Sequence, residues 1–355
     1  MTVKARTTER SDELADGLLE RLRRKPGERI SRSSLRRKFS VTDERIDRAI
    51  GSLLEWGYII RSRTDGIEFE RAPDALLQAE ITHGLKTKEF GRPTHAYRKV
   101  KSTITIASSL AGGGGGGRAG RAGAPEGTLV VAEEQSAGRG RLGRGWHSPP
   151  GVGAYLSLIL RPKMAAADTP ALSIVTALAL AEAIEELTGL PAQVKWPNDV
   201  LVRGKKVAGI LTSMTAEGER VNYVIASAGL NINQTRQDFP SSLSGKAASL
   251  RMLLRHKVDR PALTRRFLEI FERRYGAFAR SGFAPLRKKV LSRFSLLDRW
   301  VRVTDAAAIG IATRRSSTTR GKVIDIDRRG RLLVKSGAEE LALIAGEVTL
   351  EESYH

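Results

Sequence analysis

One segment constrains this chain more than any other: residues 134–161, which read EQSAGRGRLGRGWHSPPGVGAYLSLILR. A run of glycine and arginine cannot fold alone, yet a strand-like pattern flanks it on each side (TLVVA before, AYLSLIL within its end). Glycine lets the backbone bend toward a ligand, and guanidinium groups pair with phosphate or carboxylate oxygens. The segment therefore predicts an anion-binding loop, carried by Arg139, Arg141 and Arg144, whose ligand is a nucleotide or an acyl phosphate.

Other interpretations of the glycines fit less well. Residues 138–143, GRGRLG, match the bare G-x-G-x-x-G pattern, but a dinucleotide site needs a helix directly afterwards, and WHSPPG cannot begin one. The partner motifs of protein kinases and the phosphate loop of P-loop proteins do not occur in the sequence. A solvated basic linker is the ordinary alternative for a Gly/Arg run, but Trp146 and the apolar strand that follows argue against it.

Three further motifs follow the loop along the chain. The loop GRGRLGR continues into WHSP, and after it come KWPND at 195–199, KVAGIL at 206–211 and GLNIN at 229–233. Each motif alone is moderately specific, whereas all of them in this order are highly specific. In this respect the chain resembles biotin protein ligase, of the bifunctional type with an N-terminal winged helix.

The resemblance implies an ATP-dependent, AMP-forming ligase. Biotin and ATP would form biotinyl-5'-AMP, and the biotinyl group would then pass to a lysine of the biotin carboxyl carrier protein or domain of acetyl-CoA carboxylase or a related carboxylase. Biotin would be the substrate, with ATP and Mg²⁺ required. A carboxylate that attacks a phosphate brings two anions together, so cationic groups must gather them and neutralise the developing charge.

The resemblance also assigns roles to individual residues. Catalysis would depend on Lys206, Arg141 and Arg139. Biotin would contact Ser102, Thr103, Ile104, Gln135, Arg139, Gly140, Arg141, Lys206 and Gly209. ATP would contact Arg139, Arg141, Trp146, Asn198 and Asn231, with Mg²⁺ held alongside ATP near the two asparagines and no metal site in the protein alone. Lys195 and Asp199 are secondary candidates.

Two of these residues have a specific uncertainty attached. Ile104 stands where the family has Asn, so one polar contact to biotin is in doubt unless another side chain replaces it. Lys206 follows a basic turn, RGKK, and an exposed turn lysine is the alternative interpretation. Strand alternation would place Lys206 on the same face as Ala208, whose small side chain would leave room for a ligand.

Composition limits the classes of protein that remain. The chain has 355 residues, enough for two or three domains, and a formal net charge of +21, which attracts nucleic acid, nucleotides or an acidic protein. It has no cysteine, so thiol nucleophiles, disulfides and Cys-based zinc sites are excluded. No apolar leader opens the sequence and the apolar stretch 171–184 is too short to span a bilayer, so we expect a cytoplasmic protein without membrane contact.

The patterns predict an α+β protein with three parts. Residues 1–85 should form a winged helix-turn-helix with a hairpin around Asp65-Gly66. The resemblance implies that residues 86–295 form the ligase domain, a mixed sheet with helices like that of class II aminoacyl-tRNA synthetases, with a Gly-rich insertion at 112–127. Residues 296–355 should form a small SH3-like β-barrel, in which the Gly-Glu-Val at 346–348 matches a strand of the family.

Several functional alternatives stay open at this point. DNA binding through residues 1–85 would make the protein a biotin-responsive repressor, yet Asp43, Glu44 and Asp47 on the expected recognition helix would oppose phosphates. A DNA-binding biotin sensor without ligation and a lipoate-type ligase are the alternatives. The oligomeric state is undetermined, a homodimer being one option.

Overall fold

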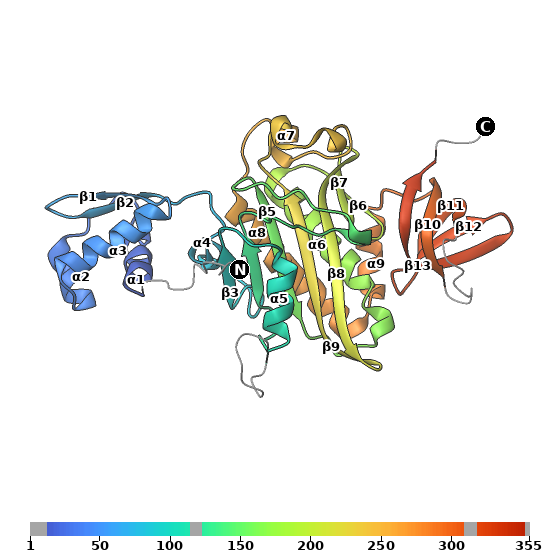
Figure 1. The fold of residues 1–355 in the computed structure, drawn as a ribbon, viewed down its shortest axis with the longest axis horizontal. Helices are drawn as coiled ribbons and strands as arrows, with labels where there is room; N and C mark the ends of the chain where they lie inside the picture. The colour runs from blue at the N-terminus through green and yellow to red at the C-terminus, as the bar shows by residue number, and fades with distance from the viewer. Residues whose placement is uncertain (1–12, 114–122, 309–317, 352–355) are drawn as a thin grey trace.

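The computed structural model describes residues 13–113, 123–308 and 318–351, and most of the expected Gly-rich insertion lies outside them. Figure 1 shows the described parts in a row along the longest axis of the molecule: N-terminal helices with a hairpin, a large sheet wrapped by helices, and a small C-terminal barrel. Among the described helices, none is long and apolar enough to cross a membrane.

The N-terminal part is a winged helix. Leu18, Leu22, Ile46 and Ile50 recur at helical spacing and meet in one buried core, as the sequence predicted. The second helix begins where the Ser31 side chain accepts a hydrogen bond from the backbone N–H of Ser34. The elements are α1 (Glu13–Arg23), α2 (Arg32–Phe39), α3 (Asp43–Glu55), β1 (Ile59–Ser62) and β2 (Ile67–Arg71).

The central part is built on a mixed sheet in the order β3-β4-β5-β9-β8-β7-β6, in which only β3 and β4 run parallel. The strands are β3 (Thr94–Tyr97), β4 (Leu129–Ala132), β5 (Gly153–Leu160), β6 (Ala192–Lys195), β7 (Asp199–Val202), β8 (Lys205–Glu217) and β9 (Arg220–Asn231). The sequence suggested a single strand at 194–202. The chain instead turns at Trp196, Pro197 and Asn198, because proline has no N–H to donate to a sheet ladder.

Helices cover both faces of this sheet (Figure 1). Helix α6 (Ala171–Thr188) is buried on all sides over its first fourteen residues, because the sheet lies on one side of it and α8 (Arg260–Ser281) on the other. Helix α5 (Thr103–Ala111) packs on the opposite face, against β4, β5 and β9. The sequence placed Ser102 and Thr103 at a strand end, whereas they begin α5. The shorter helices are α4 (Gln78–Thr82), α7 (Leu250–Leu254) and α9 (Ala284–Leu291), with 3₁₀ turns at Arg141–Gly143, Ala166–Asp168, Arg236–Asp238 and Ser241–Leu243.

The C-terminal part is a closed barrel of antiparallel strands, as the turn-rich pattern predicted. Its strands are β10 (Trp300–Ala308), β11 (Thr319–Ile326), β12 (Leu332–Ser336) and β13 (Glu339–Leu350). The barrel is fastened to the sheet domain through the turn between β6 and β7. There the buried Trp196 donates a hydrogen bond from its indole N–H to the carbonyl of Gly330, at 3.1 Å.

Buried charges join the winged helix to the central part. Arg260 on α8 is 1% exposed and pairs with Asp74 and with Glu133, the latter at 2.7 Å. Glu80 on α4 pairs with Arg23 of α1 and accepts a hydrogen bond from the hydroxyl of Tyr58. Burial raises the pKa of Tyr58 to about 12, so this hydroxyl keeps its proton at neutral pH. A paired, hydrogen-bonded charge in a buried interface fixes orientation because moving it would leave it unpaired.

Candidate functional site

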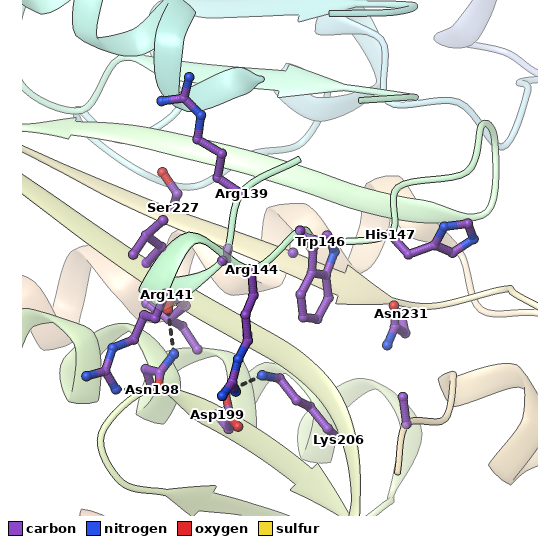
Figure 2. Close-up of a pocket in the computed structure, with 18 of the residues that line it drawn as sticks. Arg139, Arg141, Arg144, Trp146, His147, Asn198, Asp199, Lys206, Ser227 and Asn231 are labelled. Atoms are coloured by element: carbon purple, nitrogen blue, oxygen red, sulfur yellow. Dashed lines mark hydrogen bonds and ion pairs between the residues drawn. The ribbon is translucent and has the colours of Figure 1, made fainter. Parts of the chain in front are cut away.

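A pocket of about 370 Å³ opens at one end of the sheet. Its walls come from the Gly/Arg loop, from β8 and β9, from the β6–β7 turn and from the start of α5 (Figure 2). The barrel also contributes, through Glu347 and Val348 of β13. Segments that are far apart in the sequence therefore share one cavity.

The loop has a defined conformation. Arg141 and Gly143 bound a 3₁₀ turn in which Leu142 takes a positive φ of 55°. The backbone N–H of Gly140 donates to the carbonyl of Arg144 at 2.7 Å, which closes the loop on itself. The arginines of this closed loop, Arg139, Arg141 and Arg144, line the pocket, which is the arrangement expected for binding an anion.

Two arginines fasten the loop to its surroundings. Arg141, which is half-buried, donates from Nη1 to Oδ1 of Asn198 and to the carbonyl of Gly346, both at 3.2 Å. Burial lowers the pKa of the Arg141 guanidinium. Arg144 is exposed and pairs with Glu347 at 2.6 Å, and this hydrogen bond holds the pKa of Glu347 below its usual value. The barrel therefore holds the loop over the pocket.

Lys206 lies on the opposite wall. Its Nζ is 2.6 Å from Oδ1 of Asp199 and 5.5 Å from the centre of the Trp146 ring (Figure 2). The register of β7 and β8 shifts here, with Leu201 opposite Lys206 and Val200 opposite Ala208, so that one residue of β8 is extra. The prediction that Ala208 lies on the same face as Lys206 is therefore wrong. Ala208 is buried in the core, and Gly209 lies beside the lysine instead.

The floor of the pocket is a pair of glycines opposite each other, Gly209 on β8 and Gly229 on β9. The Trp146 indole lies directly on them. A Cβ added to Gly229 would come within 2.3 Å of the indole nitrogen, and one added to Gly209 within 2.8 Å of the ring. Only glycine fits at either position with the indole in this place.

At the other end, polar side chains form a continuous set of hydrogen bonds. The Gln135 carbonyl oxygen accepts from both the backbone N–H and the hydroxyl of Thr103, at 2.9 and 3.2 Å. Ser157 lies 2.9 Å from the Thr103 hydroxyl and 2.8 Å from Ser227. Thr103, Gln135 and Ser227 all line the pocket.

Comparison with known proteins identifies this arrangement. Residues 117–231 match the Biotin/lipoate A/B protein ligase family. The bifunctional ligase/repressor BirA of Bacillus subtilis is 36% identical over 327 residues, which span 87% of this chain and 94% of that protein. The chain belongs to the biotin protein ligase family.

Other members of the family agree. The biotin–[acetyl-CoA-carboxylase] ligase of Paracoccus denitrificans is 33% identical over 62% of this chain and 88% of its own length. Among solved structures, the biotin protein ligase from Aquifex aeolicus in complex with biotin and ATP superposes with a TM-score of 0.59 at 26% identity, covering 73% of this chain and 99% of that one.

The pocket brings together nearly every residue that the resemblance to biotin protein ligase implied. Those that line it are Thr103, Ile104, Gln135, Arg139, Gly140, Arg141, Trp146, Asn198, Lys206, Gly209 and Asn231, together with the secondary candidates Lys195 and Asp199. Ser102 differs, because it is buried just outside the pocket lining at the start of α5, and its hydroxyl has no hydrogen-bond partner within the described part of the chain. Arg139 lines the pocket from an exposed position.

Sequence reasoning missed other lining residues, among them Glu347 and Ser227. Glu347 was noted only as part of a barrel strand, and its Gly-Glu-Val setting was the available signal. Ser227 lies within an ordinary apolar strand pattern, VIASAGL, which contains no sign of a ligand contact. Only the pairing of β9 with β5, which sets Ser157 opposite Ser227, brings its hydroxyl into the polar end of the pocket.

Proposed function

We propose that the chain is an ATP-dependent biotin protein ligase that forms biotinyl-5'-AMP and transfers biotin to a lysine of a carboxylase carrier domain. One observation carries this proposal: a single pocket holds the cations Arg141 and Lys206 at one end and hydrogen-bonding side chains at the other (Figure 2). Biotin has a carboxylate at one end and a polar ureido ring at the other, so the two ends match.

In the first step the biotin carboxylate attacks the α-phosphorus of ATP. A bond forms from the carboxylate oxygen to phosphorus, the bond to the bridging oxygen breaks, and pyrophosphate leaves. Lys206 would hold the carboxylate and Arg141 the phosphate, so that two anions can approach. Lys206 is paired with Asp199 in the free protein, so binding would replace one anionic partner with another.

ATP requires a place for its adenine ring and its metal ion. The Trp146 indole N–H has no partner within the described part of the chain, and Trp146 lines the pocket, where its ring would stack on the adenine. Asn198 and Asn231 offer side-chain oxygens to Mg²⁺, and a magnesium ion there would neutralise phosphate charge.

In the second step the carrier lysine, as a neutral amine, attacks the acyl carbon and AMP leaves. The mixed anhydride must be kept from water until then, which requires the loop to stay closed. The contacts of Arg141 with Gly346 and of Arg144 with Glu347 support this role for the loop.

The test uses Lys206→Ala with labelled biotin, ATP and Mg²⁺. We expect adenylate formation, measured as pyrophosphate release, to fall by at least about a hundredfold, the size seen when one preorganised charge-stabilising donor is removed. Lys205→Ala is the matched control, because its ammonium donates to the carbonyl of Gly245 outside the pocket lining. Near-normal pyrophosphate release by Lys206→Ala would refute the assignment.

The alternatives are less well supported. A lipoyl group has no ureido ring to satisfy the polar end of the pocket, and the similar proteins carry biotin ligase names. A pure biotin sensor would not need Arg139, Arg141 and Lys206 together in one pocket.

We also propose that the protein is a biotin-responsive repressor that binds DNA through α3. Two of the three carboxylates that would oppose phosphates are paired, Asp47 with Arg32 at 2.6 Å and Asp43 with Arg36 at 2.8 Å. Arg45 and Arg48 on the same helix are exposed. The relatives named ligase/repressor support this second role.

Binding to duplex DNA, measured against salt concentration with biotin and ATP present, tests the repressor proposal. If Arg45 and Arg48 each neutralise a phosphate, replacing both by Ala should weaken binding and reduce the log–log salt slope by about 1.8. Arg280→Ala, at the exposed end of α8, should change neither quantity. An unchanged slope in the double variant would contradict the role of α3.

The division into residues 1–85, 86–295 and 296–355 remains our proposal for the domains. Cytoplasmic location and homodimer formation likewise remain predictions.

A further inference from the structure

The hydroxyl of Ser227 has a defined hydrogen-bonding direction. The starting point is Gln135, whose side-chain oxygen accepts the backbone N–H of Thr103 at 2.9 Å. A backbone N–H can only donate, so this contact fixes which end of the Gln135 amide is the oxygen. The Thr103 hydroxyl must then donate its single proton to the same oxygen.

This contact also fixes which hydroxyl donates in each of the two hydrogen bonds that follow. Because the proton of Thr103 is already used, Ser157 must donate in its 2.9 Å contact with the Thr103 oxygen. The proton of Ser157 is then used as well, so Ser227 must donate in its 2.8 Å contact with Ser157. Thr103 and Ser157 are 2% and 0% exposed, so no other partner competes for the two hydroxyls that set the direction.

The Ser227 hydroxyl therefore presents only oxygen lone pairs to the pocket, and toward a ligand it can act only as a hydrogen-bond acceptor. Its one proton points into the protein toward Ser157, and its side chain lines the pocket (Figure 2). Gln135 is a donor, because its side-chain NH₂ donates one hydrogen to Ser148 at 3.0 Å and its second hydrogen has no partner among the residues that the structure describes. The polar end of the pocket thus offers an acceptor and a donor.

We propose that Ser227 is a further substrate-contacting residue, which accepts a hydrogen bond from a ureido N–H of biotin. This rests on the proposed biotin ligase function. A ureido group carries N–H donors beside a carbonyl acceptor, which matches the acceptor at Ser227 and the donor at Gln135. Ser227 would also supply a polar contact to the ring where Ile104, which lines the same pocket, cannot.

The test combines a variant with a modified substrate. Ser227→Ala should raise the KM for biotin about three- to tenfold, the range for one neutral hydrogen bond, and leave kcat nearly unchanged because the reacting carboxylate is at the far end. Biotin analogues methylated singly at each ureido nitrogen are then compared. Methylation at the nitrogen that Ser227 contacts should weaken binding to the parent protein and weaken binding to Ser227→Ala less.

Control measurements separate the possible failures. Ser213→Ala, an exposed serine on the neighbouring strand β8, should keep the parent KM for biotin. If the parent protein forms no biotinyl-adenylate, the proposed function itself fails. If the parent is active but Ser227→Ala keeps its KM, or if both methylated analogues lose affinity equally in parent and variant, Ser227 has only a structural role and the inference is overturned.

Discussion

The winged helix and the C-terminal barrel both flank the sheet domain, but they meet it differently. The winged helix is joined through the buried pair of Arg23 with Glu80 and through the buried Arg260, which pairs with Asp74. Within the described part of the chain no residue before Thr103 lines the pocket. The barrel instead sends Glu347 and the carbonyl of Gly346 to the arginines of the loop.

This difference separates two ways in which a flanking domain can serve an enzyme. Contacts at the barrel belong to the pocket wall, so their loss should alter the fate of the reaction intermediate. Contacts at the winged helix fix an orientation and should matter for DNA more than for ligation. The predictions below test this contrast, beginning with the largest expected effect.

The largest effect should come from an N-terminal truncation that extends into the central core. Removing residues 1–90 would also delete Leu76, Ile81, Leu85 and Phe90, which belong to the central core. Each large core side chain is worth about 2–5 kcal/mol, so the truncated protein should not fold. A cooperative thermal transition measured by circular dichroism for this truncation would show that these residues are dispensable.

Arg141→Gly should have the next largest effect. It removes two hydrogen bonds from a half-buried guanidinium, to Asn198 and to Gly346, so adenylate should escape roughly ten- to hundredfold faster, the range for hydrogen bonds to charged groups. Hydroxylamine trapping of released adenylate measures the escape, and biotin on bystander proteins reports it independently. Arg144→Gly is the matched control, with a smaller expected leak because Arg144 is exposed.

Glu347→Gln should have a modest effect. It removes the charge from an ion pair whose arginine is 65% exposed, and such pairs contribute about 0.2–1 kcal/mol, so the leak should rise at most about fivefold. Because Arg144 lowers the pKa of Glu347, the pair is intact at neutral pH and is lost as pH falls through that lowered pKa. Adenylate retention in the parent should therefore decline on acidification. In Glu347→Gln, adenylate retention should not show the part of this decline that comes from protonation of Glu347.

The smallest effect should come from removing only residues 1–72. This truncation keeps Asp74 for Arg260 and keeps the core residues that follow, while Glu80 gains access to water in place of Arg23. Ligation measured with a carrier domain should stay within about twofold of the parent, since the change lies outside the pocket. A large loss of activity in a folded truncation would break the contrast between the two flanking domains.

The sequence predicted those parts of the molecule that depend on local patterns. The Gly/Arg loop, the hairpin around Asp65-Gly66 and the small C-terminal barrel all follow from neighbouring residues. The sequence did not predict contacts between residues that are far apart in the chain, or the change in strand pairing that one extra residue causes. Ala208 was misplaced by the irregular pairing of β7 with β8, and Ser227 gained its role through Ser157, seventy positions earlier.

The position of Trp146 on the glycine floor also makes ligand binding measurable by tryptophan fluorescence. The chain has four tryptophans, and of these Trp146 alone lies on Gly209 and Gly229 with the ammonium of Lys206 above its ring. A positive charge over an indole shifts the emission of its excited state, which has a larger dipole than its ground state. If Lys206 exchanges Asp199 for the biotin carboxylate, as proposed, the part of the fluorescence that Trp146→Phe removes should change on ligand binding.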